Sequence, residues 1–118
     1  MNEIYIDEGK SILDAMHQLD KSAKKILFVQ KEEKLVASLT DGDIRRWILK
    51  KGDMRMPVKC AANYNLKYLF EQQEDKAFYV MKEYEIDAIP IVDKNYIIKR
   101  VIFSSGPIHE DRVFNNEI

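Results

Sequence analysis

An internal duplication restricts the fold of this sequence more than any other feature. Residues 4–50 predict, in order, a short apolar strand, an amphipathic helix, two apolar strands joined by a polar turn, and a second helix. The first four of these elements recur over residues 66–103, with Met16 aligned to Met81 and Ile26 to Ile89, spacings of 65 and 63 residues. A unit of about 60 residues is too small to bury its own sheet, so the two copies are expected to pack against each other.

In the first copy the hydrophobic pattern predicts strands over 4–6, 26–29 and 35–39, and helices that begin near Ser11 and over 41–50. Two sets of residues are expected to face the core, Ile12, Ala15, Met16 and Leu19 from the first helix, and Ile44, Trp47 and Ile48 from the second.

The second copy is predicted to contain strands over 66–70, 89–92 and 96–103, and a helix over 75–84 with Phe78, Met81 and Tyr84 facing inward. Residues 104–107, Ser-Ser-Gly-Pro, break regular structure, so the final helix of the first copy is expected to be absent, short or altered here. These patterns predict an α/β (α+β) fold with one repeat over 1–51, a linker over 52–65, a second repeat over 66–105 and a tail over 106–118.

Composition excludes several classes of function. Nineteen basic and 20 acidic residues give a net charge of −1, which argues against a dedicated nucleic-acid binder. A single cysteine rules out an internal disulfide, and the two isolated histidines predict no metal site. The four glycines form no phosphate-binding loop, and no pairing of a nucleophile with a base is recognisable, so the sequence predicts no catalytic residue. It shows neither a signal peptide nor an apolar run of membrane-spanning length, and a soluble cytoplasmic protein is expected.

Two segments carry a resemblance to a known family. Residues 34–46, KLVASLTDGDIRR, resemble the end of a CBS domain, and residues 86–93, IDAIPIVD, resemble its middle part. Two such domains in tandem form a Bateman module. Residues 40–46 followed by Met56-Pro57-Val58 look like the CBS pairs fused ahead of sugar-phosphate nucleotidyltransferases. The resemblance therefore implies a non-catalytic regulatory module, with residues 106–118 leading toward a possible downstream nucleotidyltransferase domain.

The resemblance also implies a nucleotide site between the two repeats, for AMP, ATP or another nucleotide, with no required cofactor. Thr40 would lie near a phosphate and Asp43 on the ribose. The remaining expected contacts are Lys24 and Lys25 near phosphate, Ser38 through its backbone to the base, and Ala88, Ile89 and Pro90 lining the slot for the base. Most of these residues have a purely structural alternative: Thr40 and Asp43 match a capping box, and the lysines match a solvated surface. Ala88, Ile89 and Pro90 match core and strand-edge packing, which is the stronger interpretation for Ile89.

Three departures from the family pattern bear on this site. Ala37 stands where the family usually has glycine, so the backbone is expected to approach a ligand less closely. In the second copy, Ile102 aligns with Thr40 and Ser105 with Asp43, which removes the ribose carboxylate. At most one competent site, built around Asp43, is therefore expected.

Two further functions stay open. The first is a ligand-free structural module that forms a homodimer through helix faces, with Trp47 as a candidate interface residue. The second is nucleic-acid binding through the basic run over residues 45–59, which carries six basic residues against Asp53. The overall charge makes nucleic acid the weaker of the two, and no membrane partner is expected.

Overall fold

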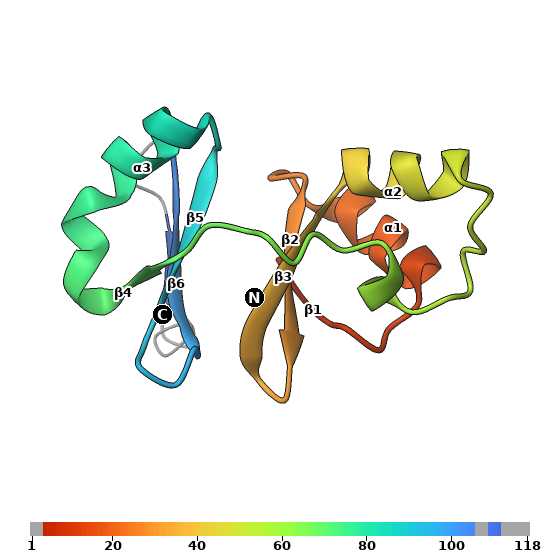
Figure 1. The fold of residues 1–118 in the computed structure, drawn as a ribbon, viewed down its shortest axis with the longest axis horizontal. Coiled ribbons are helices and arrows are strands. Elements are labelled where there is room, and N and C mark those ends of the chain that lie inside the picture. Colours follow the sequence, from red (N-terminus) through yellow and green to blue (C-terminus); the bar gives the residue numbers. More distant parts are fainter. Residues whose placement is uncertain (1–3, 106–108, 112–118) are drawn as a thin grey trace. The chain divides into compact units, whose positions relative to one another are not determined.

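The computed structural model describes residues 4–105 and 109–111, and the chain divides into two compact units between Leu66 and Lys67 (Figure 1). The first unit contains β1 (Tyr5–Asp7), α1 (Ile12–Lys21), β2 (Ile26–Lys31), β3 (Lys34–Thr40), α2 (Asp41–Leu49) and the 3-10 helix η1 (Val58–Cys60). β1 runs parallel to β2, and β2 runs antiparallel to β3, giving the sheet order β1-β2-β3. This is the predicted strand-helix-strand-strand-helix order.

Both helices of the first unit cover the same face of its sheet (Figure 1). α1 begins at the predicted place because the Ser11 hydroxyl accepts a hydrogen bond from the Asp14 N–H at 2.9 Å. The buried side chains that form the core of this unit are Ile6, Ile12, Ala15, Leu19, Leu27, Val29, Ala37, Leu39, Ile44 and Val58. Met16 and Ile48 were expected in this core but are exposed. The buried stripe of α1 follows Ile12, Ala15 and Leu19, which leaves Met16 at its edge.

Residues 52–65, predicted as a linker, pack onto the first unit. Val58 is completely buried in its core, and the Ile12 N–H donates to the Met56 carbonyl at 2.8 Å. The Tyr64 hydroxyl donates to a Glu8 carboxylate oxygen at 2.9 Å. Partial burial, followed by this hydrogen bond and the nearby negative charge of Glu8, raises the pKa of Tyr64 to about 12.

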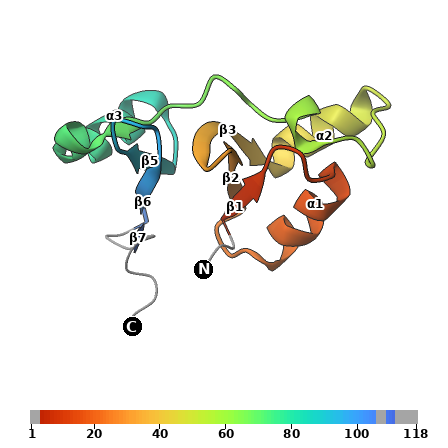
Figure 2. The ribbon, with the colours of Figure 1, turned by 90° about the horizontal axis from the view of Figure 1, so that it is seen from below.

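The second unit contains β4 (Leu69–Phe70), the 3-10 helix η2 (Glu71–Lys76), α3 (Ala77–Tyr84), β5 (Ala88–Val92), β6 (Ile98–Phe103) and β7 (His109–Asp111). Its sheet order is β4-β5-β6-β7, with β4 parallel to β5 and the other pairs antiparallel (Figures 1 and 2). The fold prediction is thus confirmed: the strand-helix-strand-strand order occurs twice, and β6 is followed by a strand rather than a helix within the described residues. Residues 106–108 and 112–118 of the predicted tail lie outside the described residues.

The buried face of α3 differs from the prediction. Ala77 and Met81, four residues apart, face the core, whereas Phe78 and Tyr84 are each 54% exposed. η2 occupies residues 71–76, so the α-helix begins only at Ala77. A helix that starts there buries the face through Ala77 and Met81.

Candidate functional site

The first turn of α2 fixes a carboxylate at the end of β3. The Thr40 hydroxyl accepts from the Asp43 N–H at 3.3 Å, and Oδ2 of Asp43 accepts from the Thr40 N–H at 2.9 Å. The Thr40 hydroxyl also lies 3.1 Å from the same Oδ2 and donates to it. This is the predicted capping box, and it satisfies the backbone groups at the start of the helix. The capping interpretation is therefore confirmed for Thr40 and Asp43, and it orients the carboxylate.

The second oxygen of this carboxylate is paired with Arg46. Nη2 of Arg46 donates to Oδ1 of Asp43 at 2.8 Å, one helical turn away. The Asp43 side chain is only 13% exposed, whereas the Arg46 side chain is 62% exposed. The acceptor that a ribose hydroxyl would use therefore already has a cationic partner. Arg46 was expected only as part of the basic run over residues 45–59, although its spacing of three residues from Asp43 predicts such a pair.

The lysines before β2 have structural partners of their own. Lys25 adopts a left-handed backbone with a φ of 59°, and its amino group donates to the Leu19 carbonyl at 3.4 Å. Its cation therefore stabilises the C-terminal end of α1, in keeping with the helix dipole. The Lys24 side chain is exposed, and its N–H donates to the Ser22 hydroxyl at 3.2 Å.

Ser38 and Ala37, two neighbouring residues of β3, both have structural roles. The Ser38 N–H donates to the Asn63 carbonyl at 3.0 Å, and the Ser38 carbonyl accepts from the Asn63 N–H at 2.8 Å. The backbone groups that were expected to meet the base of a nucleotide are thus engaged by residue 63. Ala37 is completely buried in the core of the unit. Its methyl group therefore fills core space instead of limiting the approach of a ligand.

Ala88, Ile89 and Pro90 belong to β5 of the second unit, and all three are buried. Ile89 packs in the core of that unit with Leu69, Met81 and Ile102. The core-packing interpretation of Ile89 is therefore confirmed. Ala88 and Pro90 alternate with it along the strand and point to the other face of the sheet.

The strand residues that face the two hydrophobic cores show that the sequence alignment of the two copies is wrong by one residue. Leu27 pairs with Leu39 inside the first core, and Ile89 pairs with Ile102 inside the second. Because a shift of one residue reverses the faces of a strand, Leu27 rather than Ile26 corresponds to Ile89. The counterpart of Thr40 is consequently Phe103 and not Ile102. The counterpart of Asp43 becomes Gly106 rather than Ser105, and it lies outside the described residues. The expected loss of the Thr40 hydroxyl in the second copy still holds.

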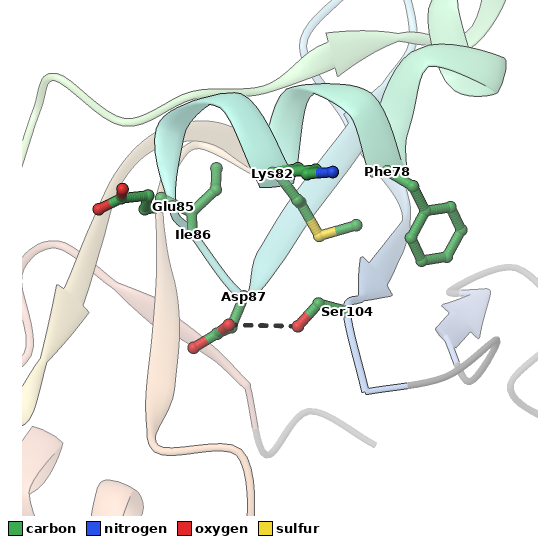
Figure 3. A pocket seen from close by; sticks show the side chains of 7 residues that line it. Phe78, Lys82, Glu85, Ile86, Asp87 and Ser104 are labelled. Carbon is green, nitrogen blue, oxygen red and sulfur yellow. Dashed lines mark hydrogen bonds between the residues drawn. The ribbon is translucent and has the colours of Figure 1, made fainter.

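Each unit carries a hollow on its helical side, in equivalent positions. The first, of about 460 Å³, lies between α1 and α2 and is lined partly by Leu13, Met16, His17 and Asp20. The second, of about 430 Å³, is lined by the α3 residues at a spacing of 65, namely Phe78, Met81, Lys82 and Glu85 (Figure 3). In the second hollow the Ser104 hydroxyl donates to Oδ1 of Asp87 at 3.2 Å (Figure 3). These hollows were not predicted from the sequence. The apolar residues Leu13 and Met16 nevertheless recur 65 residues later as Phe78 and Met81, and this repeat could have indicated them.

Trp47, a candidate interface residue, is used within its own unit. It packs against the first core, and its indole N–H donates to the Asp53 carbonyl at 3.0 Å. Within the described part of the chain, no cluster of three or more histidine, cysteine or acidic residues has the arrangement of a metal site. No helix among the described residues has the length and apolar character needed to cross a bilayer.

No family model matches the chain. Among curated proteins it is similar to arabinose 5-phosphate isomerase GutQ of Escherichia coli O6:H1, with 34% identity over 88 residues. The same enzyme of Salmonella typhi is 35% identical over 88 residues. These alignments cover 72% of the chain, and the chain spans about a quarter of the length of these relatives, 27%.

Solved structures identify the fold. A CBS domain structure, NE2398, has a TM-score of 0.70 at 25% identity over 86% of this chain and 81% of that one. The CBS domain protein PAE2072 from Pyrobaculum aerophilum, complexed with AMP, has a TM-score of 0.70 at 20% identity over 85% and 79% of the two chains. The chain has the fold of the CBS-domain proteins. The cytosolic domain of the Mg²⁺ channel MgtE in complex with ATP has a TM-score of 0.68 at 21% identity, over 89% of this chain and 44% of that one.

Proposed function

We propose that this chain is a non-catalytic regulatory module that binds an adenine or related nucleotide, with AMP and ATP as the first candidates. The observation that carries the proposal is the carboxylate of Asp43, which the capping box with Thr40 holds at the end of β3. A fixed carboxylate is the acceptor that a ribose diol needs, and bonds of this kind are charge-assisted. Two solved structures of the same fold are complexes with AMP and with ATP, which supports the choice of ligand.

The residues proposed to contact the nucleotide are Asp43 at the ribose and Thr40 near a phosphate. Lys24 and Lys25 remain candidates for the phosphates, since both lie before β2 with exposed side chains. The Ser38 side chain and the non-core face of β5, through Ala88 and Pro90, remain candidates for the base. The chemistry is reversible binding, and it requires no additional cofactor.

Calorimetric titration of the chain with AMP, ATP, GTP, CMP and a nucleotide sugar tests this proposal. We expect saturable binding of at least one of them, with a matching rise in the thermal unfolding temperature. Asp43→Asn should lose most of the affinity while its amide oxygen still accepts from Thr40. Asp53→Asn is the matched control, because Asp53 also pairs with an arginine of the same unit. Unchanged affinity in Asp43→Asn would refute the site, and no binding of any nucleotide would refute the function.

The regulated enzyme is proposed to be one that acts on a sugar phosphate, attached to the module or associated with it in the cytoplasm. The sequence resemblance favours a nucleotidyltransferase, and the curated relatives favour an isomerase of arabinose 5-phosphate. Both classes share the phosphorylated sugar as substrate. Reading the gene on both sides of this sequence distinguishes them: a glycine-rich nucleotidyltransferase segment supports the first, and a sugar isomerase domain supports the second.

A second candidate function is a structural module that forms a homodimer. The two equivalent hollows favour it, because exposed apolar side chains border both, Leu13 and Ile48 in the first unit and Phe78 in the second. Light scattering measures the assembly directly. A dimer that Ile48→Glu dissociates, and whose stability ignores every nucleotide, would favour this function over sensing.

A further inference from the structure

The Asp43 carboxylate has one oxygen that a ligand can reach without disturbing the capping box. Oδ2 already accepts from both the N–H and the hydroxyl of Thr40. Among the residues that the structure describes, Oδ1 accepts only from Arg46. A ribose diol that binds Asp43 must therefore share Oδ1 with the guanidinium or replace it.

Arg46 is the member of this pair that can move. Its side chain is 62% exposed, whereas that of Asp43 is 13% exposed and anchored by the backbone of β3. An ion pair with an exposed partner contributes little net stability, because water solvates the separated arginine well. Displacing the Arg46 guanidinium from Asp43 therefore costs little free energy, and it leaves a mobile cation beside the bound ribose.

A second guanidinium lies close to the first. Gly42 has no side chain, and both terminal nitrogens of Arg46 approach within 3.4 Å of the point where its Cβ would be. Nη2 of Arg45 approaches the same point within 3.6 Å. Among the described residues Arg45 forms no ion pair, so two guanidinium groups lie close together and only that of Arg46 is paired with a carboxylate. An additional anion at this position would reduce the repulsion between them.

We infer that Arg46 selects phosphorylated ligands by exchanging its carboxylate partner for a phosphate when the ribose binds Asp43. A guanidinium binds phosphate through two parallel hydrogen bonds, so a nucleotide replaces the interaction that it displaces. A nucleoside displaces the same interaction but has no phosphate with which Arg46 can form a new one. This inference rests on the proposed nucleotide function and adds to it the residue that distinguishes nucleotide from nucleoside.

The test compares the affinities of adenosine, AMP and ATP for the wild-type chain, Arg46→Gln and Arg55→Gln by calorimetry. Arg55 is the matched control: it pairs with Asp53 at 2.9 Å and is 88% exposed. We expect Arg46→Gln to weaken AMP and ATP about tenfold to hundredfold, the effect of one charged hydrogen-bonded contact. Adenosine should bind Arg46→Gln at least as tightly as the wild type. Arg55→Gln should leave the ratio of AMP to adenosine affinity unchanged.

Each outcome separates the exchange from the proposed function. If the wild type binds AMP and Arg46→Gln keeps the wild-type ratio of AMP to adenosine affinity, the exchange is wrong and the nucleotide function stands. A loss of adenosine and AMP affinity by the same factor would make Arg46 a structural residue and would also overturn the exchange. If the wild type binds none of these three ligands and none of GTP, CMP and the nucleotide sugar, both the function and the exchange are wrong.

Discussion

Replacement of Gly52 by alanine should destabilise the first unit through a direct collision with Trp47. A Cβ on Gly52 would lie 2.1, 2.4 and 2.5 Å from Cε2, Cδ2 and Nε1 of the indole. Because carbon atoms pack best at about 3.5–4.0 Å, the ring must shift by more than about 1 Å. That shift breaks the 3.0 Å bond from the indole N–H to the Asp53 carbonyl.

The expected loss combines three effects. Overpacking costs about 1–3 kcal/mol, and the broken hydrogen bond costs about 0.5–1.5 kcal/mol. The lower chain entropy of alanine in the unfolded state offsets about 0.4–1 kcal/mol of this. The net free energy of unfolding should therefore fall by about 0.5–4 kcal/mol. The central value of about 2 kcal/mol lowers the melting temperature of a unit of this size by about 8–16 °C.

Urea unfolding followed by tryptophan fluorescence measures this loss, because Trp47 is the only tryptophan of the chain. The folded Gly52→Ala variant should also show an altered emission spectrum. Gly9→Ala is the control, since its Cβ would meet only the carboxylate end of Asp7 at 3.1 Å. A Gly52→Ala variant with the wild-type midpoint and spectrum would refute the packing described for Gly52 and Trp47.

Three further substitutions test other parts of the structure. Thr40→Ala should lower the free energy of unfolding by about 1 kcal/mol and weaken nucleotide binding, whereas Thr40→Ser should retain the stability and the affinity of the wild type. Equal behaviour of the two variants would contradict the capping role. Ala37→Gly should destabilise the chain by about 1 kcal/mol in urea and leave calorimetric nucleotide affinity unchanged, since its methyl lies in the core. The folded state raises the pKa of Tyr64 from 10.0 to about 12, so the stabilisation is present below pH 10.0 and is lost as the pH rises to about 12. Tyr64→Phe should lose less stability over this range than the wild type, and an identical pH dependence would count against the raised pKa, which arises first from partial burial and then from the bond to Glu8.

Local signals in the sequence predicted much of the fold. The Ser11 and Thr40 side chains each cap a helix by accepting a hydrogen bond from a residue three positions later. The starts of these two helices could therefore be predicted without tertiary information. The capping box also placed the Asp43 carboxylate correctly. Its pairing with Arg46 follows from the helix repeat, and it was missed because the basic run was considered as a whole.

Features that depend on packing between residues far apart in the chain could not be predicted from the sequence. The strand spacing was one residue off because Ile26 and Leu27 are both apolar, and only the pairing with Leu39 decides which faces the core. β7 is short and largely polar, so its strand conformation depends on pairing with β6. The burial of Val58 likewise reflects tertiary packing, since its surroundings in sequence read as a surface linker.

A crystal structure of the chain soaked with AMP or ATP tests the central claim most directly. The nucleotide should lie at the end of β3 with its ribose hydroxyls within hydrogen-bond distance of Oδ1 of Asp43, and Arg46 should have turned from that carboxylate to a phosphate. A nucleotide bound elsewhere, or none at all with the Asp43–Arg46 pair intact, would contradict the account.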